Sequence, residues 1–209
     1  MSSESASRPL ALPARPSVSA ALKEWAVVCK ALEDGRQVLL LRKGGILEYR
    51  QGFEVKHHIF LLYPTYEHQS RDLIQADYAD ELDNILQNAP KMGKNRISSY
   101  AKVVKVEQVT NKSVLQKLHK FHIWNDQYVD ARMNYNPKKP MHAILLRVFK
   151  MNKPFEVEVK AEWAGCKSWI PVESLMPDPN DDSIYNEHLS VLDNWKFNKT
   201  VAEIQEILT

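Results

Sequence analysis

The chain has 209 residues, 44% of them hydrophobic, and five tryptophans, which is enough for one domain with a substantial core. Its formal net charge of +2 excludes a strongly polycationic protein that coats DNA, but it leaves room for a local basic groove. Two cysteines cannot build a disulfide framework, and this usage predicts a cytoplasmic protein. No apolar run has the length of a transmembrane helix, so we expect no membrane partner.

The first elements are a tail and a helix. Residues 1–18, rich in Ser, Pro and Ala, predict a disordered tail. Residues 21–34 predict a helix that Ser19 would cap and that Gly35, in the left-handed conformation, would end. The alternative is a hairpin of residues 25–32 and 36–42, but alternation fits this segment poorly. The apolar stripe of the helix consists of Leu22, Trp25, Ala26, Cys29 and Leu32.

The middle of the chain predicts strands separated by helices. A strand should run from residue 36 to Arg42, and alternating apolar residues predict another at 52–63, ended by Pro64. Residues 74–87 predict a helix, 89–95 a linker within the domain, and 97–109 a long strand. A short helix should follow, capped by Asn111 or Ser113 and ending at His119, and then a helix at 123–133.

Neighbouring strands dominate the last third. Residues 142–151, HAILLRVFKM, form a nearly continuous apolar run that predicts a buried strand, followed by a second strand at 154–163 and a short edge at 169–172. Two helices are expected, at 184–192 and 201–208. The irregular order of helices and strands favours an α+β fold with a curved mixed sheet. We therefore expect one domain at 19–176 and a C-terminal helical extension at 177–209.

Three segments resemble a bacterial, largely cyanobacterial family known as domain of unknown function 1802. The resemblance covers roughly residues 20–175, and it implies no activity. The segments are ALKEWAVVCKALEDGRQVLLLRKGGI at 21–46, FLLYPTYEHQ at 60–69 and FHIWNDQYVDARMNYNPKKPMHAILLRV at 121–148.

A second resemblance concerns the entry to the fold. A helix that ends at Gly35, then a basic residue and a strand closing on Arg42, is similar to the start of PUA-like domains of the ASCH type. Those domains usually carry Glu one residue before this arginine, where this chain has Leu41, and they are shorter. The resemblance implies a PUA-like pseudo-barrel with flanking helices that binds RNA or a modified base in a cleft beside the barrel.

Arg42 and Lys43 lead into two glycines, and this pattern suits a phosphate. Backbone N–H groups of a glycine turn point at oxygens while the cations supply charge. With Tyr63, Tyr66 and Trp124 available for base stacking, a groove for single-stranded nucleic acid is physically coherent. The alternative is that the aromatic side chains belong to the core and that the cations form a solvated strand end.

The loop at residues 63–69 is the densest polar cluster in the chain, and such clusters at strand ends are common sites. Glu67 and His68 in it have the chemistry of an acid and a base. Arg147 is a further candidate, because a charge within an apolar strand needs a partner or a site. An ion pair with a carboxylate such as Glu67 is the structural alternative. The predicted nucleic-acid site is therefore Arg42, Lys43, Tyr66, Glu67, His68 and Arg147.

A second function remains open at the strand that carries Glu156, Glu158 and Lys160. Two carboxylates and a lysine in this spacing are typical of Mg²⁺-dependent restriction-like nucleases, with an upstream aspartate as a further ligand. The alternative is an exposed strand face of alternating charge. Our leading hypothesis is a non-catalytic module that binds RNA, with no cofactor and no metal site. A protein-interaction scaffold, with partners that the sequence does not identify, is the third hypothesis.

Trp163 and Trp169 flank an unusual glycine-containing turn. Two indole rings at this spacing have the shape to clamp a flat ligand, or they close the end of the barrel. Closure is the favoured interpretation.

Overall fold

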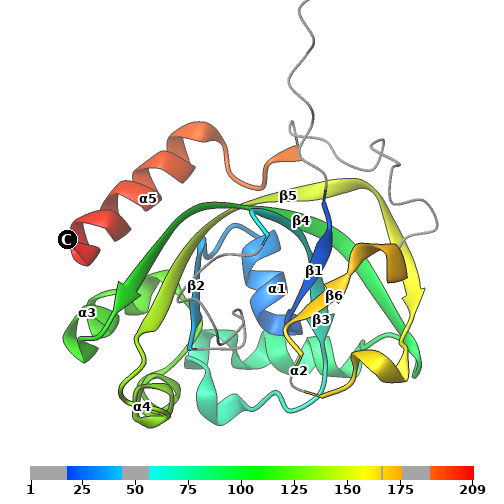
Figure 1. The fold of residues 1–209 in the computed structure, drawn as a ribbon, viewed down its shortest axis with the longest axis horizontal. Coiled ribbons are helices and arrows are strands. Elements are labelled where there is room, and N and C mark those ends of the chain that lie inside the picture. The colour runs from blue at the N-terminus through cyan, green and yellow to red at the C-terminus, as the bar shows by residue number, and fades with distance from the viewer. Residues whose placement is uncertain (1–17, 44–56, 166, 176–188) are drawn as a thin grey trace, which may run out of the picture.

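One curled, six-stranded sheet organises the molecule (Figure 1). The computed structural model describes residues 18–43, 57–165, 167–175 and 189–209. The strand order is β2-β5-β4-β3-β1-β6, in which β1 and β3 are parallel and the other pairs antiparallel. This confirms the predicted α+β fold with a curved mixed sheet. The strands are β1 Ala20–Trp25, β2 Leu39–Arg42, β3 Ile59–Thr65, β4 Lys94–Val109, β5 Met141–Glu158 and β6 Trp169–Pro171.

In the residues that the structure describes, five α-helices surround or fill the curl of the sheet. The first, α1, lies inside the curl, and α5 runs along the outside of β5 (Figure 1). Within the described ranges, no helix combines the length and the apolar character needed to cross a membrane. The helices are α1 Ala26–Glu33, α2 Ala79–Gln87, α3 Lys112–Lys117, α4 Asp126–Asn134 and α5 Asn194–Leu208.

The first strand replaces the start of the predicted helix. The helix prediction is correct from Ala26 onward, and Gly35 takes the expected left-handed conformation with φ 69°. It is wrong before Ala26, where β1 pairs with β3 and β6. Both faces of β1 are covered, so the neighbours Ala21 and Leu22 are both buried. A strand that is buried on both faces shows no alternation of polar and apolar residues. The apolar residues of this segment also match the spacing of a helix, which is why the sequence predicted a helix here.

The fifth strand is continuous where two strands were expected. It passes through Pro154, although a proline has no N–H to donate to a ladder. The pairing with β4 shifts register at this point, from Ser99 opposite Lys150 to Ile97 opposite Phe155. Prolines are tolerated in sheets at such irregularities. The predicted strand also ends early, because Ala161–Trp163 is a short 3-10 helix, η4.

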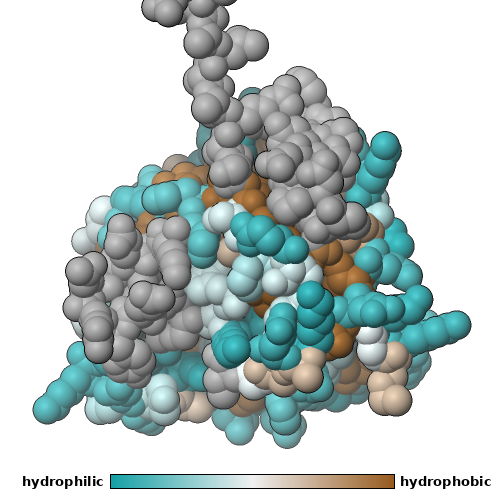
Figure 2. Space-filling view, turned by 45° about the vertical axis from the view of Figure 1, so that its right-hand side comes forward, coloured by the Kyte–Doolittle hydropathy of each residue, from teal (hydrophilic) through white to brown (hydrophobic). Residues whose placement is uncertain are grey.

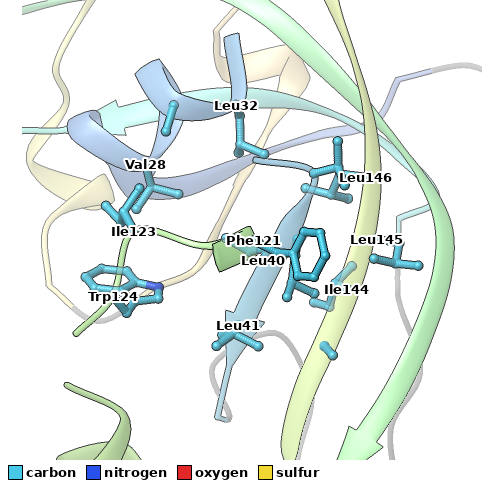
Figure 3. Packing of buried hydrophobic residues seen from close by; sticks show 14 of the residues in the cluster. Val28, Leu32, Leu40, Leu41, Phe121, Ile123, Trp124, Ile144, Leu145 and Leu146 are labelled. Carbon is cyan, nitrogen blue, oxygen red and sulfur yellow. The ribbon is translucent and has the colours of Figure 1, made fainter. Parts of the chain in front are cut away.

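Two hydrophobic cores lie on opposite faces of the sheet. Successive residues of β3 alternate between them: Phe60 and Leu62 face the core inside the curl, while Leu61 and Tyr63 face the outer core. Figure 3 shows part of the inner core, where Leu40, Phe121 and Ile144 lie close together.

The C-terminal helix α5, on the outside of β5, belongs to the same contiguous hydrophobic cluster as the residues inside the curl. Phe197 and Ile204 of α5 are buried in this cluster. A helix ending at residue 192 was expected before α5, but Val191 instead donates its N–H to the carbonyl of Val148 at 3.0 Å, beside β5. Residues 184–188 of that predicted helix, the tail at 1–17 and the predicted strand residues 52–56 lie outside the described residues. The second predicted helix is correct, but it begins earlier, at Asn194.

Side chains close the curl between β1 and β2, which three strands separate in the sheet order. The Nη1 atom of Arg42 lies 3.1 Å from Oε2 of Glu24, and its Nη2 donates to the carbonyl of Lys23 at 3.1 Å. Glu24 is 4% exposed, and the side chain of Arg42 is 19% exposed. The pair therefore joins two strands that share no backbone hydrogen bonds.

Candidate nucleic-acid interface

A cleft of about 470 Å³ opens on the outer face of the sheet, at the ends of β1, β3, β4 and β5. We call it the lysine cleft. Figure 2 brings this side of the molecule forward and shows hydrophilic side chains projecting around hydrophobic surface. The lining of the lysine cleft comprises Lys23, Tyr63, Pro64, Thr65, Tyr66, Glu67, Ala89, Pro90, Lys91, Met92, Gly93, Lys94, Asn95, Val159, Lys160, Ala161, Trp163 and Ala164.

Strand pairing brings these distant segments together. Lys23 of β1 lies opposite Tyr63 of β3 in the parallel ladder. The buried Asn95 of β4 donates its amide to the carbonyl of Pro64 at 2.7 Å, which fixes the end of β3. On the other side, the N–H of Val159 donates to the carbonyl of Gly93 at 2.8 Å. The loop before β4 is thereby joined to the segment after β5.

Aromatic side chains form the apolar part of the cleft. The buried rings of Tyr63 and Trp163 meet edge to face, with centroids 6.0 Å apart. Burial raises the pKa of Tyr63, although a hydrogen bond from Asn95 lowers it in part. Burial also raises the pKa of Tyr66. Both phenols stay neutral at physiological pH and add no negative charge. Tyr66 is half-buried and can offer its ring for stacking, whereas the rings of Tyr63 and Trp163 are buried in the wall of the cleft.

The charge of the lining is strongly positive. Four lysines against one glutamate give +3, in a chain whose net charge is +2. Lys23 donates to the carbonyls of Trp163 at 2.6 Å and Gly165 at 3.0 Å, which holds η4 against the sheet. Lys91 and Lys160 are exposed, and the ammonium of Lys160 lies 5.4 Å from the Trp163 ring. A cationic cleft with aromatic walls attracts anions that carry flat rings.

Two of the predicted site residues, Tyr66 and Glu67, line the cleft. Their neighbour His68 is exposed, has a positive φ of 60° and is absent from the lining. The loop is anchored by Gln69, whose Oε1 accepts the N–H of Val27 at 3.1 Å in the first turn of α1. Residues 63–67 of the polar loop therefore line the cleft, and Tyr66 and Glu67 are the predicted site residues among them.

Two other predicted residues, Arg42 and Lys43, have structural partners elsewhere. Arg42 closes the curl of the sheet. Lys43 is 8% exposed, and its ammonium donates to the carbonyl of Met133 at 2.7 Å. Burial lowers the pKa of Lys43. The expected glycine turn, residues 44–45, lies outside the described residues.

Arg147 anchors α5 on the outer side of β5. Its guanidinium donates to Ser190 Oγ at 3.2 Å and to Asn194 Oδ1 at 2.6 Å, and it lies 4.8 Å from the ring of Phe197. The alternative of an ion pair with a carboxylate such as Glu67 is not seen among the described residues, where two neutral oxygens and an aromatic ring surround the guanidinium.

The residues of the nuclease hypothesis do not share one strand face. Glu156 and Glu158 are exposed on β5, and Glu156 lies 3.8 Å from Lys94. The strand ends at Glu158, so Lys160 instead precedes η4 and lines the cleft. In the part of the chain that the structure describes, no three His, Cys, Asp or Glu side chains are grouped to hold a metal ion.

The tryptophans considered as stacking groups have different environments. Trp124 is 2% exposed and stacks on Tyr128 with centroids 3.7 Å apart, so it belongs to the inner core. Trp169 packs edge to face on Phe60 at 5.2 Å. Of these three, Trp163 lines the lysine cleft, whereas Trp169 is absent from the lining. The two rings therefore do not form a clamp in this cleft.

Sequence reasoning missed Lys23, Lys91 and Lys94 as site residues. Lys23 was placed on the polar face of a helix, and the loop with Lys91 and Lys94 was interpreted as a linker. The sequence Pro-Lys-Met-Gly-Lys at 90–94 carried a usable signal. Two lysines flank a glycine and a methionine that is fully exposed, directly before a long strand.

Comparisons with known proteins give a family and a distant structural likeness. A family model described as a domain of unknown function (DUF1802) matches residues 21–202. No curated protein matches the sequence. Two crystal structures of ASCH from Zymomonas mobilis, one of them a point mutant, are 12% identical and give TM-scores of 0.41 and 0.40. The mutant match covers 71% of this chain and 93% of that one, and the other covers 68% and 88%. Both are ASCH proteins, the type that the sequence resembles, but similarity at this level carries no argument about activity.

Proposed function

The chain belongs to the family described as a domain of unknown function, DUF1802, and we propose that it binds single-stranded RNA in the lysine cleft without catalysis. The observation that carries this proposal is the combination of charge and aromatic surface in one cleft. Lysines meet backbone phosphates, and aromatic faces stack with bases, which is how sequence-tolerant single-strand binding works.

The size of the cleft favours an unpaired strand. A volume of about 470 Å³ is that of a site for a single small ligand, and a base must leave its stack to enter such a site. Lys91 lies in the loop before β4 and Lys160 in the segment after β5, and the Val159–Gly93 hydrogen bond joins these two segments. The two exposed lysines therefore belong to one side of the cleft, where they can meet the phosphates next to a base that enters it.

Fluorescence anisotropy with a labelled RNA of mixed sequence tests the proposal. We expect a double Lys91→Ala and Lys160→Ala variant to lose about tenfold in affinity at moderate salt, since two phosphate contacts are removed. The matched control removes Lys117 and Lys199, two exposed lysines on α3 and α5, helices that contribute no residue to the lining of the cleft. The RNA should remain intact with Mg²⁺ present. Equal affinity of the two double variants contradicts the proposal, and Mg²⁺-dependent cleavage contradicts its non-catalytic part.

A further inference from the structure

We infer that Glu67 makes the lysine cleft selective for guanine over the other bases; this inference rests on the proposed binding of single-stranded RNA. Glu67 is the single acidic side chain of the lining. A carboxylate repels the phosphates of an RNA ligand, so its presence in a site of this charge needs a chemical reason.

The carboxylate of Glu67 is free to meet a ligand. It is exposed, and among the described residues no hydrogen bond or ion pair engages it. This distinguishes it from Glu24, which Arg42 neutralises, and from Glu156, which lies 3.8 Å from Lys94. The side chain of Gln69, which accepts the N–H of Val27, and the carbonyl of Pro64, which accepts the amide of Asn95, hold the segment on both sides of Glu67.

The chemistry of the bases selects guanine. An ionised carboxylate only accepts hydrogen bonds, and its two oxygens take two parallel N–H donors. The Watson–Crick edge of guanine presents the N1–H and the amino group side by side. Adenine and cytosine each place one amino group beside an acceptor nitrogen, and uracil places one N–H between two carbonyls that a carboxylate repels.

The rest of the lining complements the same base. Guanine carries its acceptors, O6 and N7, on the side away from its amino group, and a lysine ammonium is a common partner of these atoms. The cleft offers such donors on Lys91, in the loop before β4, and on Lys94, the first residue of β4, whereas Glu67 follows β3. An acceptor from one segment and donors from another match the polarity of guanine, with Tyr66 next to the carboxylate for stacking.

The test measures the affinity of the full chain for labelled oligouridine strands of about ten nucleotides. Each carries either guanosine, adenosine, cytidine or uridine at the centre. We expect about tenfold tighter binding of the guanosine strand, the discrimination typical of one good bidentate pair. Glu67→Gln should remove this preference, because an amide offers one donor and one acceptor. The same variant should bind oligouridine at least as tightly as the unaltered chain, because a negative charge is lost.

Glu162→Gln is the matched control, because this exposed glutamate lies beside the lining residues of η4 but outside the lining. It should keep the guanosine preference. Equal binding of all four strands, a preference for another base, or a guanosine preference that survives Glu67→Gln overturns the inference. In each of these cases RNA binding itself still stands. Failure of every strand to bind overturns the proposed function as well.

Discussion

Removing the Arg42 guanidinium should destabilise the fold rather than weaken a binding site. Glu24 is 4% exposed, and without the Arg42 guanidinium its carboxylate has the N–H of Trp25, at 2.9 Å, as its remaining partner in the described chain. Breaking a buried ion pair from one side costs about 3–5 kcal/mol. The side chain of Arg42 is 19% exposed, so we take the lower end, about 3 kcal/mol.

Urea unfolding followed by tryptophan fluorescence measures this loss. For a chain of this size, about 3 kcal/mol corresponds to a Tm that is roughly 6–12 °C lower. Arg96→Met is the matched control, because Arg96 is exposed on β4, and it should stay within about 0.5 kcal/mol of the unaltered chain. Adding Glu24→Gln to Arg42→Met should cost less than the sum of the two single changes, because both remove the same interaction.

A different pattern would refute this reasoning. If Arg42→Met leaves the free energy of unfolding within about 1 kcal/mol and abolishes RNA binding, then Arg42 is a binding residue, as the sequence alone predicted. Our account expects the RNA affinity of folded Arg42→Met to be unchanged.

Three further changes test other parts of the structure. Burial lowers the pKa of His122 from 6.5 to about 4, with a smaller contribution from the neighbouring charge of His119. The free energy of unfolding should therefore be highest above pH 6.5 and fall by roughly 3 kcal/mol between pH 6.5 and pH 4. Denaturant titrations measure this dependence on pH, and His122→Asn should flatten it. Gly35→Ala should lower the free energy of unfolding by about 2 kcal/mol, because φ is 69° and the new Cβ would lie 2.7 Å from a side-chain carbon of Leu192. Gly93→Ala, with φ 82° and open space around the new Cβ, should lower it by about half as much in the same assay. Arg147→Ala should speed hydrogen exchange in α5 without changing RNA affinity, and equal exchange would contradict its anchoring role.

The parts of the fold that the sequence predicted well are those with one dominant signal. The run HAILLRVFKM at 142–151 is buried because β5 has cores on both faces, and Gly35 was identified because few other residues accept its φ. Such signals depend on neighbours in the sequence or on composition, so they can be recognised without knowledge of the fold.

The errors arose where tertiary contacts overrode local pattern. In β1, Ala21 and Leu22 are buried on opposite faces of the sheet, so the strand imitates a helix stripe. In β5, Pro154 looks like a stop, but it lies in a register shift of the ladder. Neither feature is visible without the partner strands.

The candidate site was only partly predictable for the same reason. Tyr66 and Glu67 stood out because polar and aromatic residues crowd one loop. Lys23, Lys91 and Lys160 lie more than sixty residues apart from one another along the chain, and strand pairing alone brings them together. Arg42 and Arg147 stood out as charges, but ion pairs and hydrogen bonds within the fold explain both.

The salt dependence of RNA binding tests the central claim most directly. For a single strand, the logarithm of the affinity falls with the logarithm of salt concentration by about 0.7 for each phosphate that a cation neutralises. The Lys91→Ala and Lys160→Ala double variant should therefore have a slope shallower by about 1.4, whereas the Lys117→Ala and Lys199→Ala control keeps the slope of the unaltered chain. Identical slopes for all three proteins, or no binding at low salt, would contradict the assignment of the lysine cleft as an RNA site.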